Sequence, residues 1–535
     1  MNSPLGGHLP WAPPAIRLDQ LLSGGRADRP AVTFKSETVT YGELALRVGA
    51  AAEGLRALGI RRGDRVAVYM EKRVETIVAL LAVSRTGAVL VPVNPLFKAR
   101  HLRHVVADCA ARTVITTTER LATVDSALGE ASSVEHVVLA NAPEGAEEVF
   151  RDGRRTVPWH RLCAAEAGTG TGTVAEEPPA TDRDVAAIFY TSGSTGGPKG
   201  VVLSHGNLIA GAESVAGYLG HTADDVVLSV LPLSFDAGFS QLTTSLIAGA
   251  HLVLVNYLVP GEAVRLCARH QVTALTCVPP LWMQLAAQKW PEEATASLRY
   301  FANTGGRLPR STLATLRGLF PQASPYLMYG LTEAFRSTYL APEEVDRRPD
   351  SIGKAIPNAE VLVVRPDGSE CGPDETGELV HRGPLVALGY WNAPERTAER
   401  FRPVPGGPAV LPPEPAVWSG DLVRRDEEGF LYFVGRGDDM IKTSGYRVSP
   451  AEVEEAVYAT GLTDQAVALG VEDGHLGHHI VLVFSGGCDP EVLRKALAQE
   501  LPPYMLPRRT VALPSLPLSP NGKFDRVAVR QEVER

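Results

Sequence analysis

The feature that most constrains this chain is a glycine-rich and hydroxyl-rich run that begins where an apolar segment ends. The segment AAIFY (186–190) has the composition of a buried strand, and YTSGSTGGPKG (190–200) follows it directly. A strand that leads into such a run is the context in which backbone amides, hydroxyls and a lysine bind a polyphosphate. A flexible linker would not follow directly from a buried strand. A Walker loop is excluded because its lysine is followed by Ser or Thr, whereas Lys199 is followed by Gly200. The candidate phosphate-binding residues are Thr191, Ser192, Gly193, Ser194, Thr195 and Lys199.

Strand-like and helix-like segments alternate along much of the chain. RVAVYM (65–70) precedes the helical pattern ETIVALLAVSR (75–85), and GAVLVPV (87–93) follows it. Such alternation predicts parallel sheets covered by helices, an α/β fold. With 535 residues and 44% hydrophobic content, the chain is long enough for two or more domains. Beyond Gly435 the pattern changes, and residues 436–535 are expected to form a small α+β domain.

Composition excludes several classes of partner. The net charge of −9 gives no basic surface for a phosphate backbone, so we expect no nucleic acid. The longest apolar stretch, 77–93, is interrupted by polar residues, and the N-terminus lacks a signal-peptide pattern, so we expect no membrane span. Six scattered cysteines without zinc-ligand spacing indicate reduced thiols and a cytoplasmic location.

The run at 190–200 resembles the signature of the adenylate-forming superfamily, which contains acyl-CoA synthetases, peptide-synthetase adenylation domains and luciferases. The resemblance implies a large N-terminal domain, 1–435, built of α/β sheets plus a distorted barrel, and a small mobile C-terminal domain, 436–535. It also implies an ATP- and Mg²⁺-dependent ligase. Such an enzyme converts a carboxylic acid to its acyl-adenylate and passes the acyl group to coenzyme A or to the phosphopantetheine of a carrier protein in trans.

Three further motifs match the family's nucleotide-binding positions. In YGLTE (329–333) the match implies that Tyr329 packs on adenine, Thr332 binds phosphate and Glu333 holds Mg²⁺. In NTGG (303–306) it implies that the backbone lies along adenine, although the Arg307 that follows departs from many relatives. The residues of that turn are Thr304, Gly305 and Gly306. In WSGD (418–421) and the following GR (435–436) it implies that Asp421 binds the ribose and that Arg436 lies near ribose or phosphate.

The C-terminal motif PNGK (520–523) implies the catalytic lysine. Lys523 would bridge the substrate carboxylate and the α-phosphate and neutralise charge in the transition state. The small domain must therefore close over the nucleotide. In the family it then rotates about a hinge, here Asp438, and presents a second face, where Lys442 and Gly445 would border the pantetheine tunnel.

The segment LPLSFDAGF (231–239) matches one wall of the family's acyl pocket, with Phe235 beside the carboxylate. An aspartate at the position of Asp236 pairs with the ammonium of amino-acid substrates in relatives, which implies an α- or β-amino acid. Asp236 could instead cap the following helix. Arg336 would either select a polar or acidic group in the same pocket or pair with Asp236.

Two rivals remain at the level of sequence. One keeps the adenylation and changes the acceptor to an amine or another non-thiol nucleophile. The other is a catalytically inactive binding homologue, against which the intact Lys523, Glu333 and Asp421 argue. The amino-acid sequence of residues 329–357 also resembles that of acyl-CoA ligases in bacterial biosynthetic clusters. This resemblance implies a role in secondary metabolism and antibiotic biosynthesis.

Overall fold

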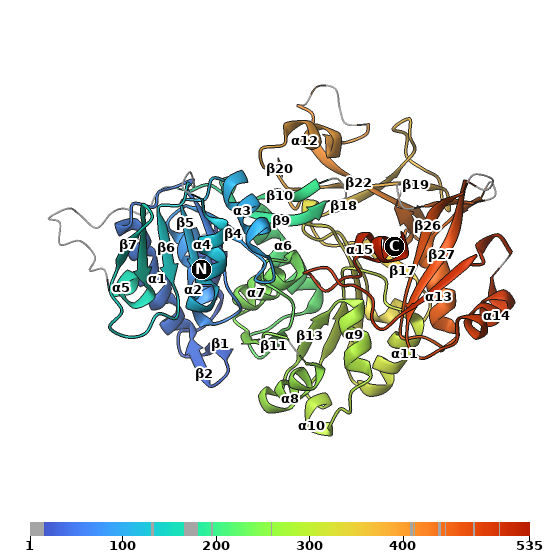
Figure 1. Cartoon of the computed structure of the whole chain (residues 1–535), viewed down its shortest axis with the longest axis horizontal. Helices are drawn as coiled ribbons and strands as arrows, with labels where there is room; N and C mark the ends of the chain where they lie inside the picture. Colours follow the sequence, from blue (N-terminus) through green and yellow to red (C-terminus); the bar gives the residue numbers. More distant parts are fainter. Residues whose placement is uncertain are drawn as a thin grey trace, which may run out of the picture.

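The computed structural model describes residues 15–129, 133–164, 180–193, 196–257, 259–406, 410, 412–436, 440–443, 446–473, 477–501 and 503–534. The strands in them form three sheets. Figure 1 shows the N-terminal sheet (blue to green) at the left and the C-terminal lobe (orange to red) at the right. Within the described residues no helix combines the length and apolar character that crossing a membrane requires.

The first sheet is mainly parallel and contains the glycine-rich run at one edge. Its strand order is β20-β10-β9-β4-β3-β5-β6-β8-β7. The strands are β3 (Arg65–Tyr69), β4 (Val89–Pro92), β5 (Thr113–Thr116), β6 (His136–Leu139), β7 (Val149–Arg151), β8 (Arg154–Pro158), β9 (Val185–Gly193), β10 (Gly196–Ser204) and β20 (Gly389–Tyr390). The predicted order of strand, helix and strand over 65–93 is confirmed, with α2 (Val74–Arg85) between β3 and β4.

The second sheet is half parallel and half antiparallel. Its order is β18-β19-β22-β23-β17-β16-β15-β14-β13-β11-β12-β1-β2, with β21 beside β22. The parallel part contains β1 (Pro30–Phe34), β11 (Val226–Ser229), β12 (His251–Leu254), β13 (Ala274–Cys277), β14 (Tyr300–Asn303) and β15 (Ser324–Tyr329). The antiparallel part contains β16 (Thr338–Leu340), β17 (Ser351–Ala355), β18 (Glu360–Val364), β19 (Thr376–Arg382), β21 (Phe401–Pro403), β22 (Pro415–Arg425) and β23 (Leu431–Arg436), and β2 (Glu37–Thr40) pairs antiparallel with β1.

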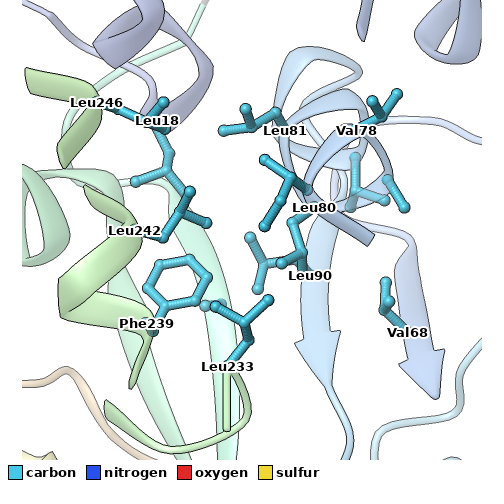
Figure 2. Close-up of a cluster of buried hydrophobic side chains, with 14 of the residues drawn as sticks. Leu18, Val68, Val78, Leu80, Leu81, Leu90, Leu233, Phe239, Leu242 and Leu246 are labelled. Carbon is cyan, nitrogen blue, oxygen red and sulfur yellow. The ribbon is translucent and has the colours of Figure 1, made fainter. Parts of the chain in front are cut away.

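Helices cover these sheets and join them through one large apolar core. Helix α7 (Asp236–Ala248) packs against α6 (His205–Leu219), and its face of Phe239, Leu242 and Leu246 lies opposite Leu80 and Leu90. Figure 2 shows the side chains of α7 facing those of α2 and β4. The other helices of this lobe are α1 (Tyr41–Ala57), α3 (Ala99–Asp108), α4 (Leu121–Ala127), α5 (Trp159–Ala164), α8 (Pro260–His270), α9 (Pro279–Ala286), α10 (Glu292–Thr295), α11 (Arg310–Leu319) and α12 (Pro394–Arg400), with 3₁₀ turns η1 (Leu18–Gly24), η2 (Thr118–Arg120), η3 (Thr332–Ala334) and η4 (Pro342–Glu344).

The third sheet forms the C-terminal lobe and has its own small cores. Its strands are β24 (Ile441–Thr443), β25 (Tyr446–Val448), β26 (Gln465–Asp473), β27 (Gly477–Ser485) and β28 (Arg509–Leu513). Its helices are α13 (Pro450–Ala459), α14 (Pro490–Glu500) and α15 (Arg526–Glu534), with the turn η5 (Pro503–Met505). The mixture of helices and a largely antiparallel sheet is the α+β arrangement expected for the end of the chain.

Candidate active site

The sequence motifs gather at one edge of the second sheet because they follow neighbouring strands. Phe235 and Asp236 come after β11, the NTGG turn comes after β14, and Thr332 comes after β15. These strands run parallel, so their carboxyl ends meet at the same edge. Open parallel sheets bind ligands at that edge.

Lys523 of the C-terminal lobe extends its side chain into this edge. Its Nζ lies 5.0 Å from the centre of the Phe235 ring. Gly305 has a φ of +75°, and a β-carbon added there would lie 2.8 Å from Cε of Lys523. Burial lowers the pKa of Lys523, the charge of Asp236 raises it, and Arg336 lowers it again, with burial the largest cause. The ammonium of the C-terminal lobe therefore lies among charged groups of the large lobe.

The turn that carries Lys523 is fixed by hydrogen bonds at its base and to the large lobe. The amide of Ser519 donates to the carbonyl of Lys523 (2.7 Å), and the amide of Gly522 donates to Ser519 (2.9 Å). Asn94, which follows β4, donates from Nδ2 to the carbonyl of Pro520 (3.0 Å) and to Oδ1 of Asn521 (3.3 Å). One amide of the large lobe thus holds the loop that presents the lysine.

A second contact between the lobes lies beside the NTGG turn. Asp350 binds Arg307 (2.6 Å), the residue that departs from many relatives, and also binds Arg310. Glu455 on α13 accepts a hydrogen bond from the amide of Arg310 (3.2 Å) and lies 3.8 Å from Arg307. Arg307 therefore contributes to holding the C-terminal lobe against the large lobe.

Arg336 is a buried cation close to the lysine. It is 4% exposed, and its Nη1 donates to Oγ1 of Thr304 at 3.3 Å. Its Nε has no hydrogen-bond partner, and no carboxylate of the described residues lies within ion-pair distance of it. The preceding Phe335 has a φ of +50°, a costly conformation that its fully buried ring, packed against Gly211, holds in place.

Asp236 lies at the start of α7 and is 4% exposed. Its Oδ1 accepts a hydrogen bond from the amide of Ala237 (2.8 Å), whereas the N-cap position belongs to Phe235. A carboxylate at a helix N-terminus is electrostatically favoured, which agrees in part with the capping alternative. The structure shows no ion pair between Asp236 and Arg336, both of which it describes, so it gives no support to a purely structural pairing.

The glycine-rich run forms a hairpin between β9 and β10. Lys199 lies opposite Thr191 across the two antiparallel strands. The Oγ1 of Thr191 is buried and has no partner among the described residues, which fits a hydroxyl that donates to phosphate. Ser194 and Thr195 lie outside the described residues, and of Ser192 and Gly193 only the backbone in β9 is described.

Lys199 forms a polar cluster with Glu333 of the YGLTE motif and with Tyr390. Its Nζ donates to Oε1 of Glu333 (2.8 Å) and to the hydroxyl of Tyr390 (2.9 Å), which donates to the same Oε1 (2.7 Å). Burial raises the pKa of Glu333, but the charge of Lys199 and the two hydrogen bonds outweigh burial and hold that pKa below its ordinary value. Glu333 is therefore an ionised, buried carboxylate. Thr332, next to it, is also buried.

The third group of predicted residues joins the end of β15 to the neighbouring strands β22 and β23 of the same sheet. The hydroxyl of Tyr329 donates to Oδ2 of Asp421, and Nε of Arg436 lies 3.0 Å from Oδ1. The Tyr329 ring stacks on His381 with ring centres 6.2 Å apart. A carboxylate accepts about four hydrogen bonds, so Asp421 retains capacity for hydroxyl donors.

The structure adds residues that the sequence did not indicate. Tyr390 and Asn94 contact the predicted residues, but neither lies in a recognised motif. Gln241, on the same helix as Asp236, carries no motif either. Gly445 and Asp438 lie outside the described residues, and of Lys442 only the backbone in β24 is described.

Comparison with known proteins identifies the family of the chain. The family model described as AMP-binding enzyme matches residues 23–391, and the model of its C-terminal domain matches residues 452–523. The chain is 34% identical to an L-proline–[L-prolyl-carrier protein] ligase of Streptomyces coelicolor, over 96% of this chain and 95% of that protein. It is 31% identical to a long-chain-fatty-acid–CoA ligase of Salmonella typhimurium, over 95% and 92%.

Among solved structures, ATP-bound MatB from Rhodopseudomonas palustris is similar with a TM-score of 0.82 and 26% identity. The match covers 97% of this chain and 98% of that one, so it includes both lobes. The chain therefore belongs to the AMP-binding enzyme family, the adenylate-forming superfamily of acyl-CoA synthetases and adenylation enzymes.

Proposed function

We propose that this AMP-forming acid–thiol ligase forms its acyl-adenylate where Lys523 lies over Gly305 and Phe235. The observation that best supports this proposal is the position of Lys523. This lysine of the C-terminal lobe reaches the carboxyl ends of the parallel strands in the large lobe. There the acid's carboxylate oxygen would bond to the α-phosphorus of ATP while the bond to pyrophosphate breaks. Lys523 would neutralise the negative charge that gathers in this step.

The nucleotide would extend from that point along the predicted residues. The hairpin residues 191–195 and Lys199 would bind the phosphates, with support from the unpartnered hydroxyl of Thr191. Thr332 would donate to the α-phosphate. The turn of Thr304, Gly305 and Gly306 would lie along the base with Tyr329. Asp421 would accept from the ribose hydroxyls beside Arg436.

Glu333 is our candidate for Mg²⁺. Magnesium binds proteins through one or two carboxylates together with substrate phosphates, and an ionised buried glutamate beside the phosphate hairpin suits that donor set. The ion would supply positive charge for the pentavalent centre. Lys199 and Tyr390 hold the carboxylate in its ionised form until phosphates arrive.

The second step requires a thiol at the same carbonyl carbon. We propose that residues 436–535 move relative to residues 1–435 about Asp438 and that Lys442 and Gly445 then border the path of the pantetheine arm. The thiolate would attack the acyl carbon and AMP would leave. The acceptor would be coenzyme A or a carrier protein in trans, and similarity to a carrier-protein ligase supports the second.

The acid would enter beside Phe235. Asp236, a buried carboxylate that accepts a hydrogen bond from the amide of its neighbour, would pair with the ammonium of an α- or β-amino acid. Similarity to a ligase of an amino acid supports that substrate class. We also propose a cytoplasmic role in bacterial secondary metabolism, including antibiotic biosynthesis.

Pyrophosphate exchange tests the proposal. We expect exchange with one class in a panel of fatty, aromatic, α-amino and β-amino acids, and a large loss for Asp236→Asn only if the acid carries an amine. Acyl transfer to coenzyme A and to purified carrier proteins then identifies the acceptor. Absence of exchange with every acid would favour an inactive binding homologue, and transfer only to amines would favour a non-thiol acceptor.

A further inference from the structure

A small cavity lies next to the reacting centre, inside the large lobe. One wall is the face of α7 that carries Ala237, Ser240, Gln241 and Thr244. The strands β11, β13, β14 and β15 form the other wall, and helix α6 closes it. Arg336, which donates to Thr304 beside Gly305, also lines the cavity. The cavity is therefore adjacent to the residues around Lys523.

Gln241 presents an unused acceptor in this cavity. It is 5% exposed, and its Nε2 donates to the carbonyls of Leu228 (3.2 Å) and Thr276 (3.5 Å). These two carbonyls fix the orientation of the amide, because a flipped amide would place oxygen against oxygen. Its Oε1 is buried, and no group in the described part of the chain donates to it. A buried acceptor left unsatisfied costs free energy, which a bound donor would recover.

The rest of the lining around this acceptor is largely polar, and Arg336 is its charged residue. His221 shares a hydrogen bond with Tyr300 (2.7 Å), and both residues line the cavity. Burial lowers the pKa of His221 to about 4, so its ring is neutral at pH 7. Its Nδ1 is buried without a partner as well. The apolar side chains of Val215 and Leu219 of α6 close the cavity, so a long alkyl chain has no path through it.

We propose that Gln241 selects short acids whose acyl chain carries a hydrogen-bond donor, a hydroxyl or an amine, beyond the carbons nearest the carboxyl. This inference rests on the proposed adenylation at Lys523 and concerns a position different from Asp236. Five helical residues separate Gln241 from Asp236, a rise of about 7.5 Å along the axis. Gln241 therefore lies farther along α7 than Asp236, and the donor that it would accept is a different group from an ammonium at Asp236.

Two pairs of acids test this with pyrophosphate exchange. Homoserine and norvaline differ only by a terminal hydroxyl in place of a methyl, and 4-hydroxybutanoate and pentanoate repeat that difference without the α-amine. We expect kcat/KM to favour the hydroxyl member about 10- to 100-fold in at least one pair. Exchange with the amino acids alone would support the role of Asp236. The ratio of kcat/KM between the two members of one pair tests the role of Gln241. 2,4-Diaminobutanoate shows whether the donor is an amine instead.

Gln241→Met replaces the amide by an apolar chain of similar length. We expect this variant to lose the preference for the hydroxyl member and to use the methyl member at least as well as the wild type. Continued use of the methyl member by Gln241→Met guards against a folding defect in that variant. Gln284→Met on α9, a residue that does not line the cavity, is the matched control and should leave the ratio unchanged.

Equal use of both members by the wild type would mean that water alone satisfies Gln241, and it would overturn the inference. A preference that survives Gln241→Met would also overturn it. Both results leave adenylation intact, whereas the absence of exchange with every acid contradicts the proposed function itself.

Discussion

A β-carbon on Gly305 would lie 2.8 Å from Cε and 3.4 Å from Nζ of Lys523, so the turn of one lobe and the lysine of the other fit only without a side chain between them. Real β-carbons essentially never lie that close to another heavy atom. Gly305 also has a φ of +75°, which other residues adopt at a cost of about 1–3 kcal/mol. The glycine therefore permits both the turn and the position of the lysine.

Gly305→Ala should displace the lysine and slow adenylation. A displacement of about 1 Å at a reacting group lowers rate about 100-fold, so pyrophosphate exchange should fall about 10- to 100-fold. Thioester formation from a supplied acyl-adenylate should fall less, because that step does not require Lys523. Gly318→Ala, where the added carbon meets nothing within 4 Å, is the control. Equal losses in both steps would contradict this explanation.

The ion pair between Lys199 and Glu333 should make the free energy of unfolding depend on pH. The folded pKa of Glu333 is lowered, so its contribution to stability is present above the unfolded pKa, about 4.3, and is lost as pH falls through the folded pKa. Lys199→Met removes the main cause of the lowered pKa and leaves a buried carboxylate. We expect a loss of about 3 kcal/mol at pH 7 by chemical denaturation. The loss should shrink below pH 4, and a loss that is constant with pH would refute the pairing.

Lys72 provides a prediction at alkaline pH. This buried lysine donates to the carbonyls of Ser229 (2.5 Å) and Leu231 (3.0 Å), which begin the loop leading to Asp236. Burial lowers its pKa to about 7. Since the unfolded chain then binds more protons between pH 7 and 10, the contribution of Lys72 to stability rises with pH in that window.

The free energy of unfolding of the wild type, minus that of Lys72→Met, should therefore increase from pH 7 to pH 10. The increase over this window should reach about 3.5 kcal/mol. Subtracting the variant removes the other groups that titrate in this range. A difference that stays flat would show that Lys72 keeps its ordinary pKa.

Much of the site could be predicted because its residues lie in local motifs at the ends of parallel strands. Gly305 follows β14 and Thr332 follows β15, and strand adjacency then brings them together. The position of Lys523 was implied by its PNGK context rather than by any local pattern. Its neighbours Asn94 and Tyr390 could not be predicted, because their roles depend on contacts across more than 50 residues of sequence.

The sequence predicted where the site residues lie better than it predicted which side chains contact one another. Two alternatives were open for Arg336, a partner in Asp236 or a place in the pocket, and only coordinates show that it donates to Thr304 and lines the cavity. Gln241 was missed because glutamine in an apolar helix carries no motif. The orientation of its amide depends on the backbone carbonyls of Leu228 and Thr276, which lie on other strands.

Lys523→Ala provides the most direct measurement of the central claim. Pyrophosphate exchange should fall at least about 1,000-fold, because the cation that neutralises the transition state is removed. Thioester formation from the supplied acyl-adenylate of the same acid should remain within about threefold of the wild type. Exchange at the wild-type rate in this variant would show that adenylation does not use the lysine that lies over Gly305.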